Sequence, residues 1–127
     1  MSTLIKILLI GSGGFTGAVL RYLVSGMVHR LFSAATVFPV GTFVVNITGC
    51  LIIGILSGLT DTRQLFTAEI RLLIFIGLLG SFTTFSTFGI ESLYLLQERQ
   101  FLFFGIYALG QLVIGLVAVW SGYTLVK

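Results

Sequence analysis

The segment LLIFIGLLGSFTTFSTFGIESLYLL, residues 72–96, decides the fold of this chain. Its centre, residues 80–88, alternates five hydroxyl side chains with three phenyl rings at i, i+3 and i+6. Lipid cannot satisfy hydroxyl groups or a loosened backbone, so such a segment at membrane depth must be buried in protein or line a water-accessible path. We therefore interpret residues 80–88 as the lining of a pore.

The rest of the chain is equally apolar, with 57% hydrophobic residues, 9% charged residues and a mean hydropathy of +1.14. A soluble domain carries roughly 25% charged residues. Stretches of about 20 apolar residues, the length that spans a bilayer, occupy residues 4–27, 38–59, 72–96 and 101–126. The sequence thus predicts an all-α membrane protein, in which residues 1–127 form a single domain of four transmembrane helices.

This organisation indicates a multi-pass protein of the cell inner (plasma) membrane. Its expected partner is the lipid bilayer, and no nucleic-acid partner is expected. A cleaved signal peptide is the alternative for the first stretch. Arg21 and the absence of a small-residue cleavage site argue against that alternative.

The third helix is expected to be broken near its middle. Residues 80–84 combine weak helix formers with hydroxyls that compete for backbone hydrogen bonds. A break frees carbonyl groups, and carbonyls at the bilayer midplane can bind a cation such as Na⁺. Beyond the break, Phe85 and Phe88 share a face, and the positive edges of their rings can favour an anion. Phenylalanines at this spacing also occur as ordinary core residues, but the interleaved hydroxyls favour a path.

Few other polar side chains lie within the apolar stretches. Thr42 and Asn46 are one turn apart in the second helix, and the Asn46 amide can donate two hydrogen bonds to an anion. Its alternative role is interhelical bonding, which is typically worth about 0.6 kcal/mol. Tyr107 and Gln111 are one turn apart in the fourth helix, so both can face one groove.

Two ionisable residues lie clearly inside the predicted helices, where a central charge costs about 2.5–3.5 kcal/mol. For Arg21 we favour a salt bridge or another structural role, with its head extended toward the interface. Glu91 follows the ring-bearing turn, and the choice between a structural role and a place in a vestibule stays open. His29, beside Arg30 at a helix end, is expected to be exposed.

Charge placement predicts the assembly. Four spans leave the two sides of the membrane with almost equal basic charge, so the chain is expected to insert in both orientations. Two oppositely inserted copies can pair about a two-fold axis in the membrane plane, which gives an antiparallel, dual-topology homodimer. A small bias that selects one orientation is the alternative. One side carries Lys6, Arg63, Arg71 and Lys127, and the other carries Arg21, Arg30 and Arg99.

Small residues four apart supply helix contacts, because they let backbones approach closely in lipid. Four helices enclose little volume, so we expect an ion path to need more than one subunit. The repeated spacings are Gly13 and Gly17, then Cys50, Gly54 and Gly58, then Gly115, Ala118 and Gly122. Cys50 has no partner within the chain, so no intrachain disulfide is expected.

Three motifs together resemble the CrcB/Fluc family of fluoride channels. TTFSTF (residues 83–88) follows Gly77 and Gly80, GGFTGAVLRY occupies residues 13–22, and GTFVVNITG occupies residues 41–49. They occur in order over essentially the full length of the chain, which makes the resemblance specific.

The resemblance implies an antiparallel homodimer with two fluoride pathways, each lined by both subunits. It implies that Phe85 and Phe88 are the pore rings and that Asn46 is the pore-lining donor. The main-chain carbonyls of Gly80 and Thr83 would hold a central structural Na⁺ shared between the subunits. Further contacts would come from Ser86, Thr87, Thr42 and Tyr107. Gln111 departs from the family pattern, which has a smaller hydroxyl residue there.

The implied function is passive conduction of F⁻, exporting the fluoride that enters a cell as its neutral acid. A proton-coupled exporter resembling the small multidrug transporters is the alternative. Those transporters depend on a carboxylate in the first helix, and this first helix has none. A non-conducting assembly subunit would not explain the polar and aromatic track. An enzyme is not expected, because no buried histidine, paired carboxylates or activated nucleophile is visible.

Overall fold

The computed structural model describes residues 1–32 and 37–127, and every regular element within them is helical. Four candidate membrane spans confirm the predicted four long apolar helices. In chain order the elements are α1 (Thr3–Phe32), α2 (Val40–Arg63), α3 (Ala68–Arg71), η1 (Leu72–Leu79), α4 (Gly80–Phe82), α5 (Phe85–Gln97) and α6 (Phe101–Leu125). The third span consists of α3 to α5, and η1 is a π-helix.

The first two helices are longer than their apolar stretches. α1 continues to Phe32, and α2 continues through a polar turn to Arg63. Gln64 then ends α2 in a left-handed conformation (φ 52°), and its N–H bonds to the Thr60 carbonyl. Residues 33–36 lie outside the described part. Pro39 directly precedes Val40, the first helical residue of α2.

The third span is bent, as predicted, and the interruption lies at the end of the predicted segment, at residues 83 and 84, and not at its first residue, Gly80. Gly80 is helical (φ −61°, ψ −30°), whereas Thr83 and Thr84 are extended, with ψ of 158° and 123°. The Thr83 N–H and hydroxyl both donate to the Leu79 carbonyl, at 3.1 and 3.0 Å. These bonds complete the last helical turn, and the extended ψ of Thr83 ends the helix at the first threonine and not at the glycine.

Glycines allow two pairs of helices, α1 with η1 and α2 with α6, to pack with their backbones in contact. A Cβ at Gly17 would meet the backbone of Leu78, so α1 crosses η1 with the backbones in contact. A Cβ at Gly54 would meet the backbone of Val119, and one at Gly122 would meet the Leu51 carbonyl, so α2 and α6 pack in the same way. These contacts confirm the packing role predicted for the small residues.

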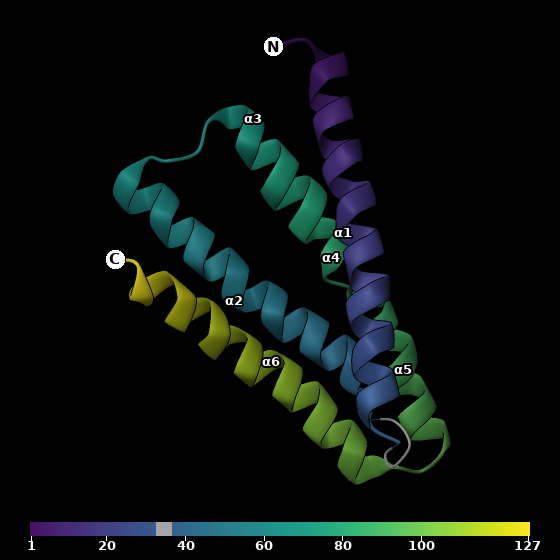
Figure 1. Cartoon of the computed structure of the whole chain (residues 1–127). Coiled ribbons are helices and arrows are strands. Elements are labelled where there is room, and N and C mark those ends of the chain that lie inside the picture. The colour runs from purple at the N-terminus through teal and green to yellow at the C-terminus, as the bar shows by residue number, and fades with distance from the viewer. Residues whose placement is uncertain (33–36) are drawn as a thin grey trace.

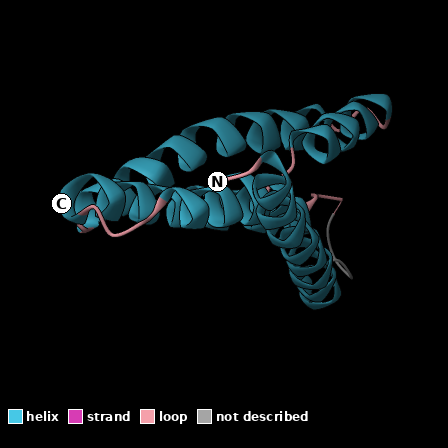
Figure 2. Ribbon diagram, turned by 90° about the horizontal axis from the view of Figure 1, so that it is seen from above, coloured by secondary structure: helices cyan, strands magenta, loops and turns pink. Residues whose placement is uncertain are grey.

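The helices form an open wedge in which α2 and α6 run side by side and α1 lies against η1 and α4 (Figure 1). Both termini and the connection between α2 and α3 lie toward one end, as four spans require (Figure 1). The view from above shows that the helices splay apart instead of forming a compact bundle (Figure 2). Many large apolar side chains are consequently exposed, including Phe15, Phe85 and Trp120.

Candidate ion pathway at the bend of the third span

Asn46 on α2 braces the interrupted backbone. Its Nδ2 donates to the Thr84 carbonyl at 3.0 Å, and its Oδ1 accepts from the Thr84 N–H at 2.8 Å. One side chain thus pairs both backbone groups of a residue that has left the helix, and unpaired buried groups of this kind are rarely tolerated. Because the two bonds are reciprocal, they also fix which end of the Asn46 amide is oxygen.

Hydroxyl groups cap the helix that follows the bend. Thr84 Oγ1 accepts from the Thr87 N–H at 3.2 Å, the usual bond of an N-cap residue. The same hydroxyl donates to Thr87 Oγ1 at 3.0 Å and lies 3.4 Å from Ser86 Oγ. Three of the five hydroxyls in the segment therefore form one cluster at the start of α5.

These side-chain bonds divert two N–H groups from their helical acceptors. The Thr84 N–H, which would close a helical bond to the Gly80 carbonyl, donates to Asn46. The Thr87 N–H, which would bond to the Thr83 carbonyl, donates to Thr84 Oγ1. The acceptors that lose these donors are the carbonyls of Gly80 and Thr83, at which the family resemblance implied a Na⁺ ion.

A cavity of about 620 Å³, here called the ring groove, opens beside the bend. Phe85 is 83% exposed there, and its ring centroid lies 5.5 Å from that of Phe88. The groove thus combines phenyl rings with two residues, Gly80 and Thr83, whose carbonyls have lost their helical donors at the bend. Its lining includes Asn46, Gly80, Thr83, Thr84, Phe85, Phe88 and Gln111.

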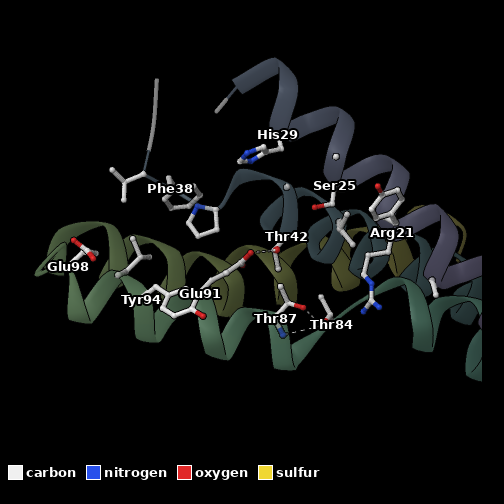
Figure 3. Close-up of a pocket in the computed structure, with 18 residues that line it drawn as sticks. Arg21, Ser25, His29, Phe38, Thr42, Thr84, Thr87, Glu91, Tyr94 and Glu98 are labelled. Carbon is white, nitrogen blue, oxygen red and sulfur yellow. Dashed lines mark hydrogen bonds between the residues drawn. The ribbon is translucent and has the colours of Figure 1, made fainter. Parts of the chain in front are cut away.

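A second cavity of about 640 Å³, here called the vestibule, lies on the other side of Thr84. Arg21, Ser25 and His29 on α1 face the α5 wall across it (Figure 3). Thr84 lines both cavities, so the bend separates them. The vestibule lining includes Arg21, Ser25, His29, Thr42, Thr84, Thr87, Glu91 and Tyr94.

Glu91 is the centre of a hydroxyl cluster in the vestibule. Thr42 Oγ1 donates to Glu91 Oε1 at 2.9 Å, and the Tyr107 hydroxyl donates to Oε2 at 2.6 Å. Both carboxylate oxygens therefore bind hydroxyls from other helices, and Arg21 lines the same cavity. The sequence left the role of Glu91 open, and only its place as a carboxylate within the third span marked it.

The predicted site residues fall into separate groups. The ring groove collects Asn46, Gly80, Thr83, Phe85 and Phe88, whereas the vestibule collects Thr42 and Thr87. Tyr107 is fully buried between them and lies 5.3 Å from Phe88, ring centroid to ring centroid. Ser86 is exposed at the start of α5.

Gln111 on α6 joins the groove to this buried cluster. Its Oε1 accepts from Asn46 Nδ2 at 3.2 Å, so both N–H groups of Asn46 are used. Its Nε2 is buried beside the Tyr107 hydroxyl, one turn earlier on α6. The position where the resemblance implied a smaller hydroxyl therefore carries a longer side chain that reaches both Asn46 and Tyr107.

The chain is similar to known proteins over almost its whole length. The family described as "CrcB-like protein, Camphor Resistance (CrcB)" matches residues 8–123. A protein of Methylobacillus flagellatus named fluoride-specific ion channel FluC is 43% identical over 96% of this chain and 94% of its own. A protein of Phocaeicola vulgatus with the same name is 47% identical over 92% of this chain and 94% of its own.

A third such relative, from Nitratidesulfovibrio vulgaris strain Miyazaki F, is 44% identical over 92% of this chain and 93% of its own. The family match includes most of each span and all lining residues of both cavities, and it confirms the family that the three sequence motifs indicated. The chain therefore belongs to the CrcB family.

Proposed function

We propose that this protein is a fluoride-selective ion channel that lets F⁻ leave the cell passively across the membrane. Relatives that carry the name fluoride-specific ion channel align with more than nine-tenths of the chain, at 43–47% identity. The observation that carries the proposal is the pair of polar and aromatic cavities that meet at Thr84. Together they offer an ion a route past the bend without a ring of charged side chains.

The lining chemistry suits a small, strongly hydrated anion. A selective pore must replace the hydration shell of its ion with groups of the protein. The Thr87 hydroxyl, which accepts from Thr84 and keeps its own hydrogen, and the positive edges of Phe85 and Phe88 are available for this purpose. Selectivity against chloride then follows from a narrow, dry constriction between groove and vestibule, because a larger anion cannot reach the same donors.

We further propose that the working unit is an antiparallel homodimer with two pathways. Support comes from Phe85, which is 83% exposed beside a largely apolar groove that Gly80 and Thr83, the residues whose carbonyls lose their helical donors, also line. Such a ring groove at membrane depth needs protein on its open side. The nearly equal basic charge on the two sides of the membrane supports opposite insertion of the two copies.

The Gly80 and Thr83 carbonyls fit a Na⁺ ion shared by the two copies. Their helical donors are diverted, and both residues line the ring groove. Carbonyl oxygen is a suitable ligand for a hard cation of this kind. A Na⁺ bound there would supply positive charge at the dimer centre and would hold the two bends together.

Liposomes test the proposed function directly. Purified protein is reconstituted with internal KF or KCl, a K⁺ ionophore is added so that K⁺ leaves with the anion, and efflux is followed with ion-selective electrodes. We expect rapid F⁻ release without a proton gradient and retention of Cl⁻, because conduction is passive. Protein-free liposomes are the control. Retention of F⁻ by liposomes that contain monodisperse, folded protein would refute the channel. Release that requires a proton gradient would instead support the exporter.

A further inference from the structure

The single histidine of the chain, His29, lines the vestibule and is exposed near the end of α1. It follows Arg21 and Ser25 at intervals of four residues, so the three side chains share one face of the helix. Figure 3 shows Arg21 toward Thr84 and His29 toward Phe38. The helical rise separates Arg21 from His29 by about 12 Å. This wall of the vestibule therefore has a permanent cation near the bend and a titratable group farther out.

The opposite wall of the vestibule carries its acidic groups. Glu91 lies on α5, and Glu98 directly follows the last residue of that helix. Both oxygens of Glu91 accept from hydroxyls of other helices, whereas Glu98 is exposed. Glu98 and His29 both lie away from the bend, on opposite walls of the cavity (Figure 3). An ion that enters the vestibule from water therefore meets these two side chains first.

The charges along the lining almost balance. When His29 is neutral, the lining has one positive group, Arg21, and two negative groups, Glu91 and Glu98, which give a net charge of −1. Histidine is the side chain whose ordinary titration falls between pH 5 and 8. Protonation of His29 therefore brings the net charge of the lining from −1 to zero.

A change of one charge alters the local concentration of an anion in the cavity. A unit charge roughly 7 Å from an ion in water changes that concentration about two- to threefold, and dissolved salt weakens the effect. The low-dielectric walls of a cleft also focus the field of the charges that line it. A neutral vestibule consequently receives F⁻ faster than a vestibule with excess negative charge.

We propose that His29 makes the entry of F⁻ into the vestibule depend on pH, with faster entry when its imidazole is protonated. This inference rests on the proposed channel function and adds a residue that acts through its charge at the entrance. In the proposed antiparallel dimer, one vestibule faces each side of the membrane. Acid converts more F⁻ into the neutral acid that crosses lipid, so conduction rises under the condition that loads a cell with fluoride.

Current through planar lipid bilayers, with NaF on both sides, tests the inference. Neutral HF carries no current, so its leak through lipid does not disturb the measurement. We expect roughly twofold more current at about pH 5.5 than at about pH 7.5 in dilute salt. The ratio should approach one when sodium gluconate raises the ionic strength to about 1 M, because screening then acts within about 3 Å. A structural effect of protonation would not follow ionic strength in this way.

Substitutions at one exposed position separate charge from shape. His29→Gln cannot titrate and should give the lower current at both pH values, whereas His29→Arg is always positive and should give the higher current at both. Arg30→Gln is the matched control, because Arg30 is exposed on the same turn but does not line the vestibule. It should keep the ratio between the two currents.

Three outcomes distinguish the inference from the function on which it rests. A ratio that persists in His29→Gln would overturn the inference, because another group would then be responsible. Equal currents at the two pH values in the unsubstituted protein would also overturn it and leave the channel function intact. Absence of F⁻ current at either pH would instead refute the channel itself.

Discussion

Asn46 makes interhelical hydrogen bonds, one of the two roles that its sequence context presents as alternatives. The sequence suggests either an anion donor or an interhelical bond, and in the structure both N–H groups are used on Thr84 and Gln111. Each net hydrogen bond of this kind contributes about 0.5–1.5 kcal/mol, and leaving the Thr84 groups unpaired would cost more. A part for Asn46 in conduction stays a proposal. The two hydrogen bonds by which Asn46 holds the Thr84 backbone are observed in the structure.

The two phenyl rings provide a test at the same scale. Phe85→Ile and Phe88→Ile each remove a ring edge from the groove but keep an apolar side chain, so we expect reduced F⁻ efflux. Phe85 is largely exposed, so its replacement should leave purification and oligomeric state unchanged. Phe101→Ile, at the exposed start of α6, is the matched control and should conduct normally. Normal efflux from both groove variants would contradict the proposed role of the rings.

At the scale of elements, the bend depends on contacts from several helices. α2 supplies Asn46, α1 covers η1 and α4, and α6 places Tyr107 against Phe88. The α1–η1 crossing is tight because Gly13, Gly17 and Gly77 bring the two backbones into contact. This crossing therefore fixes the position of the segment from which the bend begins.

Enlarging one glycine tests that crossing. Gly17→Ala places a Cβ against the Leu78 backbone, which cannot move aside as a flexible side chain would. We expect a loss of about 1–3 kcal/mol in unfolding free energy, the usual range for overpacking, measured by thermal or denaturant unfolding in detergent. Gly11→Ala on the same helix meets nothing within 4 Å and should be tolerated. Equal stability of the two variants would argue against the crossing as a fixed support.

At the scale of the whole molecule, the open wedge leaves one side of the candidate site uncovered. The ring groove and large parts of α1 and α6 are exposed in the single chain. Either lipid or a second copy covers them in the membrane, and lipid cannot pair the Gly80 and Thr83 carbonyls, whose helical donors are diverted. This is the structural support for the proposed dimer, and it links assembly to conduction.

Topology is the measurement that decides the antiparallel arrangement. A tag at Lys127 should be found on both sides of the membrane, because basic charge is nearly balanced between them. Gln97→Lys combined with Gln100→Lys adds two positive charges to the α5–α6 connection and should shift the chain toward one orientation. Loss of F⁻ efflux in that variant, restored by co-expression with an oppositely biased copy, is the expected outcome. A single tag orientation in the unsubstituted protein would contradict the model of dual insertion.

The sequence by itself determined the membrane class, the four helices, the family and the existence of the bend. Each of these depends on local composition: apolar length sets a span, weak helix formers set an interruption, and ordered motifs set the resemblance. The ends of the helices were harder to predict, because α1 and α2 continue through polar turns that apolar length does not register.

Only the tertiary structure decided where the bend lies and how the polar residues divide between two cavities. Thr84 leaves the helix because Asn46, 38 positions away, pairs its backbone, and no local pattern contains that bond. Glu91 joined the site because Thr42 and Tyr107 approach it from two other helices. The contact between Gln111 Oε1 and Asn46, two residues 65 positions apart, likewise appears only in the structure. Hydrogen bonds between distant segments depend on how helices pack, and the glycine contacts that set this packing appear only in three dimensions.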